Sequence, residues 1–312
     1  MTTDVSLRTA LASSSGLEED LFKRKDIAHV FIHHNKVVGL QGIPGLSIEH
    51  KERDDGVSLN VILEKNIKVA QPVHMCFGLM HKQGLQQIQM DVQIKEKASM
   101  QVFAHCTFPN AINVQHLMDA TLTIGRNASY SYIERHIHGD SGGITVVPKA
   151  RIHLLEHARY KTDFELLTGR VGHLDIDYEA ECDAYSTLEM NARINATHTD
   201  VVRIKEKGAL NGDYAHGVLL TRVAVRNQAT AEVYSELTAS AAYARGHVDC
   251  KEIVQDDGVV SAVPIVKVNH PKAHITHEAS LGSVDSKQLQ TLMARGLDEE
   301  RATNLIIQGL LR

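Results

Sequence analysis

One short pattern recurs along the middle of this chain and constrains its fold more than any other feature. Two apolar residues flank a single residue, and an alanine follows four positions later. Copies stand at Val92/Ile94/Ala98, Leu122/Ile124/Ala128, Ile152/Leu154/Ala158, Leu174/Ile176/Ala180 and Val223/Val225/Ala229, with a looser copy at Val202/Ile204/Ala209. The alternation is that of a half-buried strand. Repeats of roughly 20 to 30 residues that cannot bury a face alone stack into a solenoid. We therefore expect a mainly β chain folded as a parallel β-helix, with alanine where the chain bends.

The alternative fold is a β-sandwich, whose strands also alternate. Its hairpins are typically marked by tight two-residue turns such as Asn-Gly, and this chain has one such pair, Asn211-Gly212. Aromatic residues make up 4% of the chain and tryptophan is absent. Both observations favour the solenoid, because its narrow interior suits valine, isoleucine, leucine and alanine.

Composition excludes several classes of protein. With 312 residues, 43% of them apolar and 23% charged, the chain is expected to be globular with a sizeable core. The formal net charge of −5 argues against nucleic-acid binding. No run of about 18 apolar residues and no secretion signal is visible, so neither membrane insertion nor secretion is expected. Four separate cysteines without a C-x-x-C pair indicate free thiols in the cytoplasm.

Three parts are expected along the chain. Residues 1–56 form an N-terminal lead-in, with helix-like patterns at 6–11 and 17–22 and short strands between 27 and 48. Residues 57–284 form the β-helix core. Residues 285–312 form two short helices, with Asp285 and Asp298 as N-caps and Gly296 ending the first. Their apolar stripes comprise Leu289, Leu292 and Met293 on the first helix, and Ala302, Leu305, Ile306 and Leu310 on the second. Such helices either cap a solenoid or dock a partner.

Cys250 has an unusual setting for a cysteine. A lone cysteine is more often a small core residue, and Cys76 and Cys182 fit that interpretation. Cys250 instead has histidine, aspartate, lysine and glutamate among its near neighbours. A thiolate near carboxylate and imidazole donors suits a thiophilic metal such as iron, although one cysteine cannot hold a cluster alone. Downstream, His277 and Glu278 are adjacent, so on a strand only one of them can face inward.

Two other patterns point to functions that the sequence does not support. His153, Glu156 and His157 match the spacing of an inverted zinc-peptidase motif, but that chemistry needs a helix, and the repeat places this segment on a strand. Asp175 and Asp177 would suit the outer groove of a β-helix carbohydrate-active enzyme, but such enzymes are usually secreted. The chain also lacks a nucleotide-binding G-x-x-x-x-G-K loop, so any nucleotide energy is expected from a partner.

The stretch after residue 248 resembles the C-terminal end of the SufB/SufD family of the SUF iron–sulfur cluster assembly system. Five features recur in order: a cysteine, a strand beginning with proline, a His-Glu-Ala segment, a connecting loop and a helix pair with Arg-Gly at the joint. They correspond to Cys250, Pro264 to Asn269, His277 to Ala279, the loop that follows, and Arg295-Gly296. Residues 105–109, His-Cys-Thr-Phe-Pro, are similar to a Gly-Cys-Thr-Ala-Pro stretch of the SufB branch, with histidine in place of glycine.

This resemblance implies a right-handed parallel β-helix and a SufB-like scaffold, since the chain keeps both Cys250 and Glu278. It implies that Cys106 accepts sulfur and that Cys250, Glu278 and His277 are metal ligands of a transient iron–sulfur cluster, [2Fe–2S] or [4Fe–4S]. It further implies docking of a SufC-type ABC ATPase, which would hydrolyse ATP while this chain is not itself an enzyme. The expected docking residues are Leu289, Leu292, Met293, Arg295, Gly296, Leu305 and Ile306.

A compact member of this family is expected to form either a homodimer or a heterodimer with a SufD-like chain. Pairing through the C-terminal β-helix would bring Cys250 and Glu278 of both chains together. The alternative is a SufD-like structural partner that docks the ATPase and holds no cluster. A β-helix carbohydrate-active enzyme is the more distant alternative.

Overall fold

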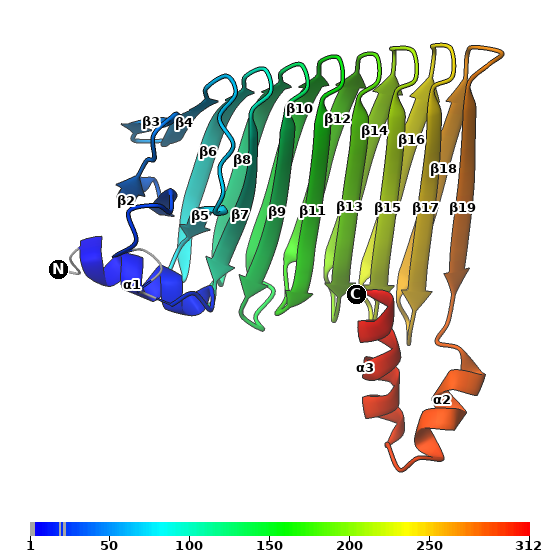
Figure 1. Ribbon diagram of the computed structural model, residues 1–312. Helices are drawn as coiled ribbons and strands as arrows, with labels where there is room; N and C mark the ends of the chain where they lie inside the picture. Colours follow the sequence, from blue (N-terminus) through cyan, green and yellow to red (C-terminus); the bar gives the residue numbers. More distant parts are fainter. Residues whose placement is uncertain (1–3, 19, 21–22) are drawn as a thin grey trace.

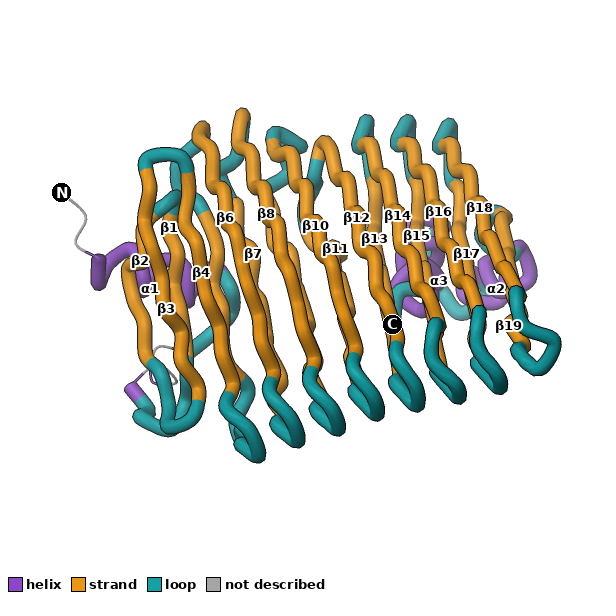
Figure 2. The backbone as a smooth tube through the Cα atoms, turned by 90° about the horizontal axis from the view of Figure 1, so that it is seen from above, coloured by secondary structure: helices purple, strands orange, loops and turns teal. Residues whose placement is uncertain are grey.

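Two facing β-sheets wind along the chain as the repeat predicts. The structure is a computed structural model and describes residues 4–18, 20 and 23–312. From β5 onward, successive strands alternate between the sheets, and about eight turns stack side by side (Figures 1 and 2). Neighbouring strands of a sheet are parallel except for the antiparallel pairs β1/β2 and β3/β4. The predicted mainly β parallel solenoid is therefore confirmed.

Within the described residues, the strands form a ten-stranded and a nine-stranded sheet. The ten-stranded sheet contains β1 (His29–His33), β2 (Lys36–Gln41), β5 (Val73–Gly78), β7 (Ser99–Phe108), β9 (Ser129–His138), β11 (Arg159–Thr168), β13 (Thr187–Ala196), β15 (His216–Val225), β17 (Arg245–Val254) and β19 (His274–Gly282). The nine-stranded sheet contains β3 (Leu46–Arg53), β4 (Gly56–Leu63), β6 (Gln83–Ile94), β8 (Asn113–Ile124), β10 (Ile144–Leu154), β12 (Gly172–Cys182), β14 (Val201–Leu210), β16 (Thr230–Ala239) and β18 (Val259–Val268).

The core is the space between the two sheets. Along each central strand, buried and partly exposed residues alternate with a period of two, as in β13 and β16. Inward side chains are therefore buried against those of the facing sheet, while outward ones form a polar surface. Because the turns are in register, an inward residue also lies beside the inward residues of the turns before and after it.

The corners of the solenoid repeat regularly. Ser99 pairs in register with Ser129, and Arg159 with Thr187, so one turn takes 28 to 30 residues. A small buried residue follows six successive corner turns at one side of the molecule, at Ala98, Ala128, Ala158, Ser186, Ala215 and Ala244. The residue before each has a φ between 56° and 60°, at Lys97, Asn127, His157, Tyr185, Tyr214 and Tyr243. The last four of these residues have aromatic rings, which stack in succession with 4.6 to 5.1 Å between neighbouring centroids.

The alanine pattern expected from the sequence is correct for the first three copies and wrong for two later ones. Ala180 and Ala209 lie within β12 and β14 rather than at corners. Ala229 precedes β16 and belongs to the opposite corner of the turn. The physical reason is that alanine also occurs at ordinary strand positions, whereas the corner is fixed by the 28-to-30-residue pitch.

The N-terminal segment packs against the start of the solenoid. Helix α1 (Asp4–Ser14) covers the outer face of β1 and β5 through Leu11 and Ala12, which contact Phe31 and Cys76. The expected strands between residues 27 and 48 are present as β1 to β3, and they already belong to the two sheets. The predicted helix-like pattern at 17–22 includes residues 19, 21 and 22, which lie outside the described residues.

Two helices follow the last strand, α2 (Ser286–Met293) and α3 (Glu299–Leu310). Asp285 caps α2 by accepting from the Gln288 amide, and Asp298 caps α3 by accepting from the Arg301 amide, both as predicted. The predicted stripe on α3 is only partly correct. Its buried residues are Ala302, Thr303 and Ile307, and Ile307 packs with Leu311 on Ala224 of β15.

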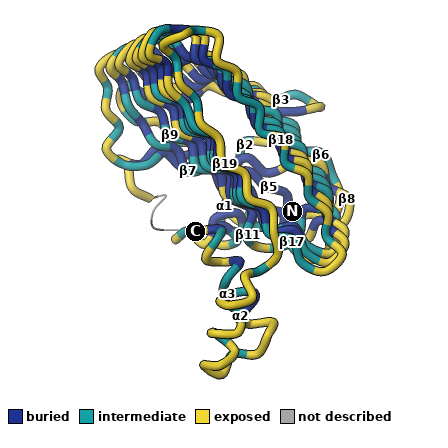
Figure 3. Tube along the Cα trace, turned by 90° about the vertical axis from the view of Figure 1, so that its right-hand side faces the viewer, coloured by how far each residue is buried: buried dark blue, intermediate teal, exposed yellow. Residues whose placement is uncertain are grey.

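The C-terminal end of the solenoid is open. Within the described residues, β19 and β18 are the last strands of their sheets, and their residues are mostly exposed (Figure 3). Large apolar side chains on this end are exposed at Val259, Val263, Val268 and Leu281. Unpaired strand edges with exposed apolar residues are surfaces that proteins normally cover.

Candidate functional site

Cys106, the predicted sulfur acceptor, lies near the end of β7 with its side chain inside the solenoid. Strand alternation sends Val102, Ala104 and Cys106 inward, and all three are buried. The thiol donates a hydrogen bond to Oε1 of Glu134 at 3.6 Å. Burial, and then the neighbouring Glu134, raises the pKa of this thiol well above its ordinary value. Cys106 is therefore a protonated thiol at neutral pH and needs a change at the site to become nucleophilic.

Glu134 is a buried carboxyl group on the inward face of β9. Its Oε1 lies 2.8 Å from Nε2 of His136, and its Oε2 accepts from the Tyr178 hydroxyl at 3.4 Å. Burial raises the pKa of Glu134 to about 7, because a buried carboxylate loses its hydration.

A chain of two histidines fixes where the proton of Glu134 lies. The Arg170 carbonyl can only accept, so Nδ1 of His138, 3.2 Å away, donates to it. In the neutral ring, Nε2 of His138 then accepts from Nδ1 of His136 at 3.1 Å. Burial lowers the pKa of His136 to about 3, so this ring is neutral too and its Nε2 accepts. Glu134 must therefore carry a proton to donate to it.

His116 completes a cluster of three potential metal ligands. It extends from β8 of the facing sheet, and its ring nitrogen, the Cys106 sulfur and a Glu134 oxygen all lie within 4.8 Å of one another. All three residues are buried. Neither ring nitrogen of His116 has a hydrogen-bond partner among the described residues. Burial lowers the pKa of His116 to about 3, so the ring is neutral.

A row of inward polar side chains leads from this cluster toward Cys250. Beyond Glu134, the Tyr178 hydroxyl is the next group. Tyr178 pairs in register with Glu206, and Glu206 with Ser235. The Cys250 thiol lies 3.9 Å from the Ser235 hydroxyl. We call this set the interior polar row; it comprises Cys106, Glu134, Tyr178, Glu206, Ser235 and Cys250, all of them buried.

Cys250 lies on β17, the strand next to the open edge of its sheet. Its side chain points inward and is fully buried. Burial, and then Glu252, raises the pKa of the Cys250 thiol to about 11. The polar neighbours that made its sequence setting unusual alternate with it: Asp249 and Lys251 point outward, where Asp249 pairs with Arg222. In one chain alone, Cys250 thus occupies a core position.

The two other predicted ligands lie on β19, on opposite faces. His277 pairs in register with the inward Val248 and therefore shares the face of Cys250. Glu278 pairs with the outward Asp249, and its carboxylate lies 3.5 Å from Nζ of Lys251. Within one chain the structure thus brings His277 to the side of Cys250 and places Glu278 on the other side of the sheet. Both residues are exposed, because β19 is the last strand.

The residues predicted to dock an ATPase remain accessible on the C-terminal helices. Met293 and Leu305 are exposed apolar side chains, and Arg295 and Gly296 lie in the exposed joint between the helices. Leu289, Leu292 and Ile306 are half-buried. A cavity of about 560 Å³ separates the helices from β17 and β19, with lining residues that include Lys251, Glu252, Leu292, Leu305 and Ile306. The predicted docking residues are therefore adjacent to the strand of Cys250.

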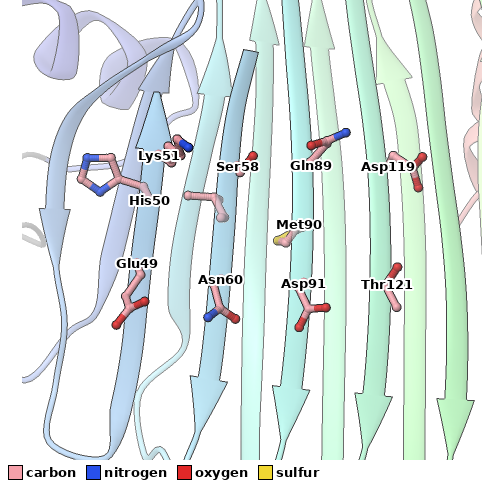
Figure 4. A pocket seen from close by; sticks show the side chains of 11 residues that line it. Glu49, His50, Lys51, Ser58, Asn60, Gln89, Met90, Asp91, Asp119 and Thr121 are labelled. Atoms are coloured by element: carbon pink, nitrogen blue, oxygen red, sulfur yellow. The ribbon is translucent and has the colours of Figure 1, made fainter. Parts of the chain in front are cut away.

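The outer surface has a further hollow, of about 520 Å³, across β3, β4, β6 and β8. Polar side chains stand in rows along it, and Figure 4 shows Glu49, Asn60, Asp91 and Thr121 on successive strands. Elsewhere on the outer face, Asp177 forms ion pairs with Arg151 and Lys205. Asp177 is one of the two acidic residues considered above for a carbohydrate-active enzyme.

The residues that match the zinc-peptidase spacing do not form a metal site. His153 lies on β10 and pairs with Asp183, while His157 lies in the following corner turn. Among the described residues, no helix is long and apolar enough to cross a membrane.

Fold and site together define a class of protein: a parallel β-solenoid whose interior holds Cys106 and Cys250 with buried polar groups between them, and a helix pair at its open end. Residues 77–310 match the profile of the SUF system FeS cluster assembly, SufBD core domain. The chain belongs to this SufBD family and so has a role in iron–sulfur cluster assembly.

Relatives cover nearly the whole chain. An iron-sulfur cluster assembly SufBD family protein of Methanocaldococcus jannaschii is 36% identical over 294 residues, which cover 93% of each chain. Another, of Pyrococcus horikoshii, is 35% identical over 296 residues, covering 95% of this chain and 90% of the relative. The iron-sulfur cluster assembly protein SufB of Bacillus subtilis is 32% identical over 69 residues, which is 22% of this chain and 15% of that protein.

Sequence reasoning missed His116, Glu134 and Glu206. A signal for each exists in the alternation itself. His116 stands at an inward position between Val114 and Met118, and Glu134 follows Tyr130 and Tyr132 at the same two-residue spacing. A titratable residue at an inward position of a regular strand is unusual, because burial penalises its charge.

Proposed function

We propose that this chain is the scaffold on which an iron–sulfur cluster is built, with Cys106 accepting sulfur and Cys250 holding the cluster. The interior polar row is the observation that carries this proposal. It joins two cysteines that lie on β7 and β17 and are separated by five strand spacings of about 4.8 Å, or about 24 Å in all. That distance is too long for one direct thiol exchange. The hydroxyl and carboxyl groups between them offer hydrogen bonds to a sulfur species moving inside the solenoid.

The cluster site is proposed to form between two chains at the open end of the solenoid. The exposed apolar residues of β18 and β19 and the unpaired edge of β19 support an interface there. A second copy of this chain or a SufD-like chain would supply the remaining ligands. Cys250 and His277 face the interior and Glu278 faces outward, so the full ligand set requires donors from both chains or a displacement of β19.

Edge-to-edge pairing alone would leave the two Cys250 thiols apart. Three strand spacings of about 4.8 Å, roughly 14 Å, would separate β17 of one chain from β17 of the other. Two thiolates that share a small cluster must approach more closely than this. The proposal therefore includes an opening step that displaces β19 and exposes the buried Cys250.

A SufC-type ABC ATPase is proposed to drive that step through α2 and α3. The helices leave apolar side chains exposed, and the cavity beneath them reaches Lys251 and Glu252, the neighbours of Cys250 on β17. Movement of the helix pair on ATP binding would thus act directly on the strands that enclose the cluster ligands.

One observation favours a second candidate, a SufD-like partner that docks the ATPase but holds no cluster. Cys250 is fully buried with a raised pKa, and Glu278 faces away from it. A chain with no cluster duty would keep Cys250 as an ordinary core residue.

Anaerobic reconstitution with ferrous iron and sulfide distinguishes the two. The scaffold proposal expects sulfide-to-iron charge-transfer absorption in the wild type that is lost in Cys250→Ser. Cys182→Ser is the matched control, because Cys182 is another fully buried inward thiol, and it should keep the absorption. A cluster retained in Cys250→Ser would refute the assignment. Absent absorption in all three proteins, with binding of a SufC-type ATPase intact, would establish the SufD-like alternative.

A further inference from the structure

Three side chains of different ligand chemistry converge at one point inside the solenoid. They come from three strands and both sheets: Cys106 from β7, His116 from β8 and Glu134 from β9. One ligand atom from each lies within 4.8 Å of the other two, and each residue is almost completely buried. Such a convergence of thiol, imidazole and carboxyl in an interior of apolar side chains calls for a physical reason.

Hydrogen bonds to neighbouring groups explain how the carboxyl group of Glu134 can be buried, but they do not explain the burial of His116. Glu134 contacts the thiol of Cys106, the ring of His136 and the hydroxyl of Tyr178. His116 is 1% exposed, and both of its ring nitrogens lack a partner among the described residues. Burying such a donor and acceptor without partners is costly, of the order of 1 to 3 kcal/mol for each group. An imidazole kept at that cost has a lone pair available for a ligand.

The spacing of the cluster fits a metal ion. For a tetrahedral ion with bonds of about 2.3 Å to sulfur and about 2.1 Å to oxygen, the two ligand atoms stand about 3.6 Å apart. The Cys106 sulfur and Oε1 of Glu134 are separated by 3.6 Å. His116 approaches this pair from the opposite sheet, and the three atoms need to close only slightly around an ion.

Supporting contacts also match those of metal sites, where partners of the ligands fix ligand orientation. In the metal-free protein the protonated carboxyl group of Glu134 is held by His136 and Tyr178. To ligate an ion through Oε1, Glu134 passes this proton to Nε2 of His136, which then donates to the carboxylate. His136 is held in turn by His138, which donates to the Arg170 carbonyl. The ring of His116 rests against Phe108, with 5.0 Å between ring centroids.

We infer that Cys106, His116 and Glu134 bind one divalent transition-metal ion of intermediate softness, such as Fe²⁺ or Zn²⁺, within the solenoid. Thiolate and imidazole donors select such ions over Mg²⁺ and Ca²⁺, which prefer oxygen ligands. Three protein ligands leave one coordination position open for an exchangeable ligand. A thiolate that ligates a metal is not free to accept sulfur, so metal loading and sulfur loading of Cys106 exclude each other.

Cobalt(II) is the probe for the test, because its thiolate complexes absorb in the near ultraviolet and visible. The parent protein carries Cys250→Ser, which removes the thiolate proposed for the cluster and separates this test from that proposal. It is produced in cobalt-containing medium, so that the buried site is filled while the chain folds, and it is also titrated anaerobically. We expect one cobalt ion per chain with thiolate charge-transfer absorption. Excess Zn²⁺ or Fe²⁺ should displace the cobalt, and Mg²⁺ should not.

Single replacements in this parent locate the site. Cys106→Ser should abolish the charge-transfer absorption, and His116→Gln should weaken cobalt binding by at least about tenfold. Cys182→Ser, which alters another buried thiol, should leave both the charge-transfer absorption and the cobalt affinity unchanged. If circular dichroism shows that Cys106→Ser does not fold, Glu134→Gln replaces it in the test, because glutamine has nearly the same shape as glutamate. Glu134→Gln should also weaken cobalt binding by at least about tenfold. Absence of the absorption in the parent, its persistence in Cys106→Ser, or unchanged affinity in His116→Gln would overturn the inference.

Discussion

Glu206 gives the sharpest test of the interior polar row, because it is an acid in the core whose titration should govern stability. It is 1% exposed, and its Oε2 has no hydrogen-bond partner among the described residues. Burial raises its pKa from 4.5 to about 8. The folded chain therefore binds this proton more tightly than the unfolded chain does. The contribution of Glu206 to stability is complete below pH 4.5 and is lost as the pH rises toward 8.

The expected size follows from the shift. Each pH unit between those two values removes about 1.4 kcal/mol from the free energy of unfolding. Between pH 5.5 and 7.5 the wild type should therefore lose about 3 kcal/mol through this one group. Glu206→Gln keeps the shape and cannot ionise, so the variant should gain about that much relative to the wild type over the same interval.

Denaturant unfolding of both proteins at pH 5.5 and 7.5 measures this difference. Glu232→Gln on the outer face of β16 is the matched control, since its carboxylate is 71% exposed and folding removes little of its hydration. A stability difference between Glu206→Gln and the wild type that is the same at both pH values would refute the reasoning. It would mean that the Glu206 carboxyl is hydrated or paired in the folded protein.

Three further predictions concern the rest of the molecule. Arg170→Ala should lower the free energy of unfolding by about 3 to 5 kcal/mol, because it leaves the fully buried Asp200 without its ion-pair partner; adding Asp200→Asn should restore much of the loss in the same unfolding assay. Leu305→Asp should weaken binding of a SufC-type ATPase by about tenfold or more, with an unchanged melting temperature because Leu305 is 46% exposed; unchanged binding would remove α3 from the docking surface. Val263→Glu with Leu281→Glu should convert a dimer to a monomer in light scattering without unfolding, because both side chains are exposed at the open end, and an intact dimer would place the interface elsewhere.

The fold was predictable because its signal is local. A period of two marks each strand, and it needs no knowledge of which strand lies beside it. The corners were harder to predict, since their left-handed residues are lysine, asparagine, histidine and tyrosine rather than glycine. The pattern predicts a corner at Ala180 because the apolar alternation before Ala180 is the same as that before Ala158. Only the pitch of 28 to 30 residues separates the two cases.

The site was less predictable because it depends on register. Cys250 and Glu278 are 28 residues apart, whereas the pitch at this end is 29 residues, as the pairing of Cys250 with Ala279 shows. One residue of difference places Glu278 on the opposite face of the sheet. The convergence of His116 with Cys106 and Glu134 involves both sheets, so no spacing within one strand reveals it.

The same regularity determines where polar groups stand in the core of a solenoid. In a globular core, a buried acid must find a partner among unrelated neighbours, and an isolated one is strongly penalised. In this fold every inward position lies beside the equivalent positions of two adjacent turns, about 4.8 Å away. A polar residue on one turn therefore stands beside the equivalent position of the next turn, as Tyr178, Glu206 and Ser235 do in register. Polar groups in such an interior tend to form rows, and a row leads from one point of the molecule to another. A stack of turns is thus well suited to joining two distant cysteines within one chain, which a compact core of the same size would do only by chance.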